Sequence, residues 1–198
     1  MGRIRNQNPL LIKVKAKVKV EHSKIHKMVP GRRLSKEFFI RDVLDVAPDL
    51  IGKNLIMRSG DETYGRFKIT EVEAYRGIED KACHACKGRT RRTEIMYHEG
   101  GRLYVYLVYG MYWMLNVVTG PEDIPQAVLI RGVEKYSGPG IITKSFGIDG
   151  TFYGEDLDIS DRIWFEDTGV TPDVRTGPRI GVDYAGDYWK TRPWRYYI

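Results

Sequence analysis

Beyond Gly52 the chain consists largely of short runs rich in β-branched and aromatic residues, and this pattern limits the possible folds more than any other feature. The runs cover residues 55–58, 63–75, 103–108, 111–118 and 126–133. Runs of this length and composition are typical of β-strands. Ser59, Gly60 and Asp61 predict a turn between the first two. The C-terminal third, rich in glycine and proline, predicts short strands over 179–182 and 195–198.

One segment before these strands has the periodicity of a helix. Its apolar residues fall at positions 40, 43, 44, 47, 50 and 51, and Gly52 follows where a glycine commonly ends a helix. Several strands with few, scattered helices predict the α+β class with an antiparallel or mixed sheet. A chain of 198 residues suits one domain, which we expect over residues 34–198.

Residues 1–33 form a basic N-terminal tail. They hold ten Lys or Arg residues against one acid, Glu21, so the tail carries +9 and the remainder −3 of the net +6. Such a tail binds polyanions by counterion release, without sequence preference. Positions 12–20 alternate apolar and basic residues, which fits a half-buried strand or a disordered arm equally well. If the natural protein starts at Met28, the segment before it is not native.

The composition also argues against several classes of protein. No run approaches the roughly 20 consecutive apolar residues that cross a bilayer, so we expect no membrane insertion. Two cysteines, Cys83 and Cys86, cannot form a disulfide framework, and no apolar segment near the N-terminus resembles a signal peptide. We therefore expect an intracellular location.

A carboxylate lies within the apolar and aromatic strand predicted over 63–75. Glu73 is followed by Ala74 and Tyr75, and a regular strand would place Glu71, Glu73 and Tyr75 on one face. Burial there would raise the pKa of Glu73, which suits a general base. A solvated strand face is the more ordinary interpretation of these residues when they are considered alone.

Five aromatic residues occur between positions 103 and 113, around a predicted hairpin turn at Tyr109 and Gly110. Packing in the core accounts for Tyr104 and Trp113. A tyrosine at an exposed tip needs another partner, and a nucleic-acid base is one candidate. Proteins that extrude a base from a duplex need a wedge for the vacated space and an aromatic platform for the base. This segment could supply both.

Five basic groups lie between the two aromatic segments: His84, Lys87, Arg89, Arg91 and Arg92. Hydroxyl side chains are interspersed among them, as in loops that contact nucleic-acid phosphates. A solvated surface loop is an equally simple explanation.

The Cys83-His84-Ala85-Cys86 sequence raises the possibility of zinc or redox chemistry. A structural zinc site needs four ligands, and the chain has two cysteines and four histidines, of which His22 and His26 lie in the tail. We therefore expect no metal. The alternative is a metal-dependent hydrolase centred on Cys83, His84, Cys86 and His98.

Ordered blocks of the sequence resemble the alkyladenine (methylpurine) DNA glycosylase family. The similarity extends from about Leu34 to the C-terminus. Its blocks are EVEAYRGIED at 71–80, His84, LYVY at 103–106, GMY at 110–112, Asn116, LIRGVE at 129–134, SGP at 137–139 and RIGV at 179–182. The resemblance implies a fold like the C-terminal domain of formyltransferases, with a curved sheet and a protruding β-hairpin.

The same resemblance implies a monofunctional DNA glycosylase of base-excision repair. Such an enzyme flips a damaged purine out of double-stranded DNA and hydrolyses its bond to the sugar, which leaves an abasic site. The substrate class comprises alkylated or deaminated purines such as 3-methyladenine, 7-methylguanine, hypoxanthine and ethenoadenine. The family acts without metal or organic cofactor, and we expect a monomer.

Individual roles also follow from the resemblance. Glu73 matches the glutamate that deprotonates the attacking water, and Arg131 matches an arginine near that water. The residues matching those that enclose the base are Tyr75, His84 and Tyr106, and Asn116 matches an asparagine that would clash with the 2-amino group of guanine. Tyr109 matches the intercalating tyrosine. The residues matching contacts to the DNA backbone are Arg89, Thr90, Arg92, Met111 and Tyr112.

The chain departs from the family at several positions on the expected DNA-binding surface. Relatives carry some tens of residues between the positions of Glu134 and Ser137, where this chain passes almost directly from one block to the next. Arg91 and Thr93 replace a proline and an asparagine, and Ile141 replaces a lysine. We expect the basic tail or Arg91 to compensate for the reduced surface.

The pocket assignments also require a particular hairpin. Tyr106 and Asn116 must share one face of the sheet, whereas a two-residue turn at Tyr109-Gly110 would place them on opposite faces. We therefore expect an odd loop or a bulge.

Two further alternatives remain from the residues. One is a non-catalytic nucleic-acid-binding module, for which Glu73 would be exposed and far from any pocket. The other is an RNA-binding barrel like the formyltransferase C-terminal domain.

Overall fold

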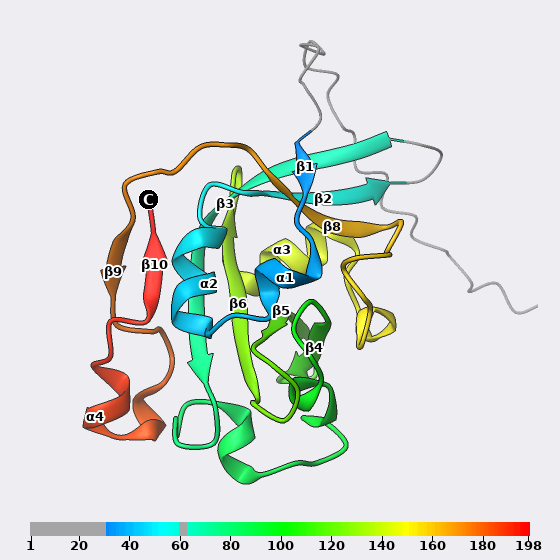
Figure 1. Ribbon diagram of the computed structural model, residues 1–198. Coiled ribbons are helices and arrows are strands. Elements are labelled where there is room, and N and C mark those ends of the chain that lie inside the picture. Colours follow the sequence, from blue (N-terminus) through cyan, green and yellow to red (C-terminus); the bar gives the residue numbers. More distant parts are fainter. Residues whose placement is uncertain (1–30, 60–62) are drawn as a thin grey trace, which may run out of the picture. The chain divides into compact units, whose positions relative to one another are not determined.

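A ten-stranded antiparallel sheet is the main element of the computed structural model, which describes residues 31–59 and 63–198 (Figure 1). The alternating segment at 12–20 and most of the predicted turn at 59–61 lie outside these residues. The strands are β1 Arg32–Arg33, β2 Asn54–Ser59, β3 Thr63–Arg76, β4 Leu103–Val108, β5 Tyr112–Thr119, β6 Gln126–Val133, β7 Tyr136–Ser137, β8 Ile163–Asp167, β9 Arg175–Gly177 and β10 Arg195–Tyr197. Their order is β1-β8-β2-β3-β6-β5-β4, with β10 between β3 and β9 and with β7 beside β6.

Helices are few and short among the described residues. The α-helices are α1 Lys36–Phe39, α2 Val43–Leu50, α3 Pro139–Phe146 and α4 Asp187–Lys190, and the 3-10 helices are η1 His84–Lys87, η2 Glu94–Tyr97, η3 Gly150–Phe152 and η4 Asp183–Ala185. This open antiparallel sheet with few helices confirms the predicted α+β class. None of these helices has the length and apolar content that a membrane-spanning segment needs.

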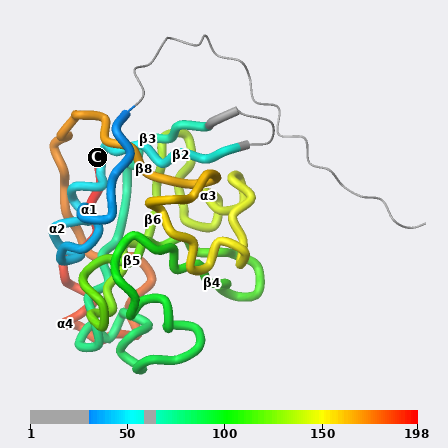
Figure 2. The backbone as a smooth tube through the Cα atoms, turned by 45° about the vertical axis from the view of Figure 1, so that its right-hand side comes forward, coloured from blue at the N-terminus to red at the C-terminus, as the bar shows by residue number. Residues whose placement is uncertain are grey.

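The predicted helix before the strands is α2. Asp42 caps it by accepting a hydrogen bond from the Leu44 N–H, and Gly52 follows with a φ of 84°, a conformation that favours glycine. Its apolar face is buried against β3 and β6 (Figure 1). Helix α3 covers β5 and β6 on the same side (Figure 2). The sequence analysis did not predict α3, although Pro139 at its start and Gly147 at its end are typical boundary residues.

Strand β3 carries the central residues of the molecule. Its first half pairs with β2, and its second half pairs with β6 on one edge and β10 on the other. A bulge around Thr70 marks the change of partner. Gly132 of β6 faces this bulge, and a Cβ atom there would lie 2.8 Å from Thr70 Oγ1 and 2.9 Å from Glu71 Cβ. Only glycine allows this close approach without movement of β3.

The two faces of the sheet pack against different parts of the protein. On one face Val72, Leu115 and Ile130 alternate with their neighbours to join the main hydrophobic core beneath α2 and α3. Because side chains alternate along a strand, Glu73, Asn116 and Arg131, and likewise Tyr104 and Tyr106 of β4, point to the opposite face. That face is covered in part by η1 and η2.

The β4–β5 hairpin has an odd loop. Val108 pairs with Tyr112, so the connection contains Tyr109, Gly110 and Met111. Tyr109 and Gly110 both have positive φ, and the Met111 N–H donates to the Val108 carbonyl, as in a type I′ turn with one additional residue. Tyr106 pairs with Met114, and Tyr104 with Asn116. Tyr106 and Asn116 therefore lie on one face, as their assignment to one pocket requires.

One expected strand needs correction. Residues 179–182, predicted as a strand, form an irregular loop, because Gly181 has a φ of 77° and the Ile180 N–H donates to a side chain instead of a neighbouring strand. At the other end, Arg32 and Arg33 form the short strand β1, in which Arg32 pairs with Asp167 and Arg33 with Glu166 of β8.

Candidate active site

Glu73 is fully buried in the second half of β3. Its Oε1 accepts a hydrogen bond from the Ile180 N–H at 2.7 Å, and its Oε2 accepts one from the Tyr75 hydroxyl at 2.8 Å. Arg131 of β6 contacts both oxygens less closely, with Nε 3.3 Å from Oε1 and Nη1 3.5 Å from Oε2. Arg131 also lies 3.2 Å from Glu71, so one guanidinium bridges two carboxylates.

Opposing influences act on the pKa of Glu73. Burial raises it and is the largest effect, whereas Arg131, the Ile180 N–H and Tyr75 favour the charged form, and the net result is a raised pKa. The raised pKa makes this carboxylate more basic than an exposed glutamate. That property suits a group that accepts a proton from water.

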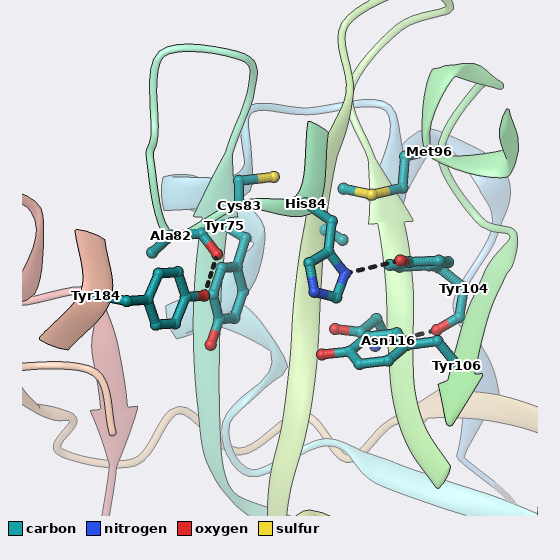
Figure 3. A pocket seen from close by; sticks show the side chains of 10 residues that line it. Tyr75, Ala82, Cys83, His84, Met96, Tyr104, Tyr106, Asn116 and Tyr184 are labelled. Atoms are coloured by element: carbon teal, nitrogen blue, oxygen red, sulfur yellow. Dashed lines mark hydrogen bonds between the residues drawn. The ribbon is translucent and has the colours of Figure 1, made fainter. Parts of the chain in front are cut away.

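A cavity lies between two groups of aromatic side chains (Figure 3), and Tyr75, whose hydroxyl donates to Glu73, forms part of its lining. Tyr75 and Tyr184 lie on one side, and His84, Tyr104 and Tyr106 lie on the other. The remaining lining residues are Ala82, Cys83, Met96, Asn116 and Ala127. Aromatic faces on opposite sides of a gap can hold a planar ring by stacking.

Hydrogen bonds fix the polar groups of this cavity. His84 Nδ1 lies 2.8 Å from the Tyr104 hydroxyl, and Asn116 Nδ2 donates to the Tyr104 carbonyl at 3.0 Å (Figure 3). Burial, with a further contribution from Arg92, lowers the pKa of His84 to about 4, so its imidazole is neutral at physiological pH. With the amide nitrogen of Asn116 engaged, its Oδ1 is the atom available to a ligand.

A buried ion pair supports Tyr75 and the loop that carries Ile180. Arg179 donates to both oxygens of Asp80, at 2.5 Å and 2.9 Å, and both side chains are fully buried. Arg179 also donates to the Ala74 carbonyl and lies over the Tyr75 ring, with Cζ 4.8 Å from the centroid. The pair connects the turn after β3 to the loop that donates to Glu73.

The family model described as Methylpurine-DNA glycosylase (MPG) matches residues 37–137 and 134–198, which together span most of the chain. The chain belongs to this family. Membership makes the protein a DNA glycosylase, an enzyme that hydrolyses N-glycosyl bonds in DNA.

Individual relatives agree with this assignment. Three proteins named "Putative 3-methyladenine DNA glycosylase" are similar over most of their length. The one from Psychrobacter cryohalolentis is 44% identical, covering 76% of this chain and 84% of its own length. Those from Clostridium novyi and Legionella pneumophila are 40% and 43% identical, and each covers 84% of this chain.

The hairpin tip of the glycosylase is an exposed apolar surface. Tyr109 is 87% exposed, Met111 68% and Tyr112 45%. Most of the Tyr109 side chain is therefore open to solvent, which is unusual for a large aromatic residue.

The basic loop has a more varied structure than its charge suggests. Arg89 is held by Glu94 and Asp123, and Thr90 bonds to Thr93. The guanidinium of Arg92 instead lies over the Tyr106 ring, with Cζ 4.8 Å from the centroid. Arg89 must therefore release or share its acidic partners to bind a phosphate.

The Cys83-His84-Ala85-Cys86 segment contributes to the cavity through packing. Cys83 is buried and lines it, with a pKa that burial raises to about 12, so the thiol stays protonated. Within residues 31–59 and 63–198 no three His, Cys, Asp or Glu side chains gather as a metal site would require. In this structure Cys83 lines the cavity as a packed, protonated side chain.

Sequence analysis missed four contributors to the site. Tyr184 lines the cavity and donates to the Ala82 carbonyl at 3.0 Å (Figure 3), Asp80 and Arg179 form the buried pair, and Ile180 supplies a backbone N–H to Glu73. Three of them lie in the blocks at 71–80 and 179–182 that resemble the family. Their roles depend on contacts across about a hundred residues, which no local pattern reveals.

Proposed function

We propose that this glycosylase excises alkylated and deaminated purines from double-stranded DNA, with Glu73 as the general base. The observation that carries the proposal is a buried, hydrogen-bonded carboxylate beside an aromatic-lined cavity. The proposed class includes 3-methyladenine, 7-methylguanine, hypoxanthine and ethenoadenine. Tyr75, His84 and Tyr106 would enclose the flipped base, and Asn116 would present its Oδ1 toward the base edge.

The contacts of Glu73 indicate where the nucleophilic water would bind. Each carboxylate oxygen has two acceptor positions, and the short bonds from Ile180 and Tyr75 occupy one position on each. The longer contacts to Arg131 are the weakest of the four. A water molecule between Glu73 and Arg131 would replace one of them, accepting from the guanidinium and donating to the carboxylate.

The chemical step is a hydrolysis. The water oxygen forms a bond to C1′ of the flipped nucleotide, the bond from C1′ to the purine nitrogen breaks with its electron pair going to the base, and Glu73 takes the water proton. No lysine lines the described cavity, so we propose no Schiff base and an intact abasic product.

The surface would bind DNA around the flipped nucleotide. Tyr109 would enter the vacated space, with Met111 and Tyr112 beside it, while Arg89, Thr90 and Arg92 would face the DNA backbone. The proposal also includes a monomer and a domain over residues 34–198 that is similar to the formyltransferase C-terminal domain. Sedimentation of the purified protein tests the monomer.

The test is base release from duplex oligonucleotides containing hypoxanthine and from methylated genomic DNA. Glu73→Gln keeps the size and most hydrogen bonds but removes the basic oxygen, so release should fall at least about 100-fold while duplex binding persists. Glu71→Gln is the matched control, since it removes the same charge from the same strand and also contacts Arg131, and it should retain most activity. Binding without release by the wild type would instead support the non-catalytic module.

A further inference from the structure

An arginine lies against each of the two main aromatic walls of the cavity. Arg179 Cζ is 4.8 Å from the centroid of the Tyr75 ring, and Arg92 Cζ is 4.8 Å from that of Tyr106. Both contacts are within the range of a cation–π interaction. The two arginines therefore lie at the same distance from their tyrosine rings. Their charges would act equally on a bound base if both were neutralised to the same extent.

The two charges are not equally compensated. Arg179 forms two hydrogen bonds with Asp80, and the pair is neutral as a unit. Arg92 has no ion pair with any residue in 31–59 or 63–198, and its neighbour Arg91 adds a second positive charge to the same loop. Within the described part of the protein, the Tyr106 side of the cavity therefore carries a positive charge that no acidic side chain compensates, whereas the Tyr75 side does not.

Arg92 lies outside the cavity and acts across its wall. Tyr106 lines both the base cavity and a second hollow on the surface, which is also lined by Arg91, Val105, Leu107 and Tyr153. Arg92 lines this second hollow and is not among the residues that line the base cavity. Its charge still reaches the cavity, because it contributes to the lowered pKa of His84, after burial.

We propose that Arg92 determines which charge type of lesion the enzyme prefers, favouring purines that are neutral when bound over purines that carry a permanent positive charge. This inference rests on the proposed function. When the glycosidic bond of a neutral purine such as hypoxanthine breaks, the electron pair makes the departing base an anion, which a cation behind Tyr106 stabilises. An alkylated purine such as 7-methylguanine is already a cation, so the same charge disfavours its transfer from the duplex into the cavity. It is then less favoured relative to the bound duplex than a neutral purine, although it departs neutral.

The expected size follows from the distance. A base stacked on the inner face of Tyr106 would lie about 9 Å from Arg92 Cζ, taking roughly 4.5 Å between stacked ring centres. At an effective dielectric constant of about 20, with further screening because Arg92 is exposed, removal of the charge should change the rate ratio about five- to twenty-fold.

The experiment measures single-turnover release of 7-methylguanine and of hypoxanthine from duplexes of one sequence, at saturating enzyme. Saturation removes effects on DNA affinity, while transfer of the base from the bound duplex into the cavity remains part of each rate constant. The ratio of the two rate constants cancels general losses of activity. Arg92→Gln should raise the 7-methylguanine to hypoxanthine ratio about five- to twenty-fold. Arg91→Gln removes the same charge from the adjacent residue, which does not contact Tyr106, and should change the ratio less than about two-fold. Arg92→Lys keeps the charge and should keep a ratio near that of wild type.

The possible results distinguish failure of the proposed role of Arg92 from failure of the proposed function. Release of neither base by the wild type would overturn the proposed function and, with it, the role of Arg92. Release of both bases with equal ratios in wild type and Arg92→Gln would overturn the role of Arg92 alone. An equal change in Arg91→Gln and Arg92→Gln would also overturn it, because the effect would then belong to the loop's total charge.

Discussion

Replacing Arg179 by methionine removes the positive half of a fully buried ion pair while keeping a similar apolar volume. Asp80 would lose both guanidinium hydrogen bonds and retain only those from the N–H groups of Arg76 and Ala82, at 3.1 Å and 3.0 Å. An unpaired buried charge typically costs about 3–5 kcal/mol. For a domain of this size, that loss corresponds to a fall in melting temperature of about 6–20 °C.

The assay is equilibrium unfolding in urea, followed by circular dichroism, on a double-mutant cycle of Arg179→Met, Asp80→Ala and the double variant. The double variant should cost clearly less than the sum of the single variants, because neither charge remains buried alone. Lys190→Met is the matched control, since its pair with Asp187 is exposed to solvent and should contribute little to stability. A cost below about 1 kcal/mol for Arg179→Met, or additive single effects, would refute the reasoning.

Three further predictions concern catalysis and packing. The proposed general base Glu73 acts in its ionised form, and its pKa is raised, so single-turnover release should decline as the pH falls through a value above 4.5. Arg131→Gln should move this acidic limb to still higher pH, because Arg131 favours the charged form of Glu73; an unmoved limb would contradict this electrostatic role. Gly132→Ala should lower the free energy of unfolding by about 1–3 kcal/mol, because the new Cβ would overlap Thr70 and Glu71; an unfolding curve like that of wild type would show that the bulge adapts. Tyr109→Ala should leave stability within about 0.5 kcal/mol and lower release from duplex DNA about tenfold, whereas an unaltered rate would remove the tip from DNA recognition.

The strands near the site were predictable because their side-chain alternation is local. Strand β6 has the predicted bounds, Gln126–Val133, and the α2 segment shows the expected apolar face. The hairpin was predictable for another reason. The requirement that Tyr106 and Asn116 share one face of the sheet predicted an odd loop or a bulge, and the loop has three residues.

The segment around Arg179 was not predictable in the same way. Its β-branched residues and arginine suggested a strand, but Gly181 reverses the backbone and the Ile180 N–H goes to Glu73. Strand propensity describes how well a residue fits a pleated, half-buried surface. Here the hydrogen bond from the Ile180 N–H to Glu73, 107 positions earlier, outweighs that local preference. Asp80 was equally hidden, because a carboxylate in a turn shows nothing of the arginine that will bury it.

Strand β3 pairs with β10, which is synthesised much later, so the surroundings of Glu73 depend on the C-terminal part of the chain. Glu73 is opposite Arg195, and its Ile180 partner lies 107 residues further along the chain. The basic loop and the hairpin, by contrast, close over short separations and can form earlier, since short loops cost less entropy to close. During synthesis the β4–β5 hairpin can therefore form before Glu73 has its Ile180 partner. The surroundings of Glu73 are complete only after β10 has paired with β3.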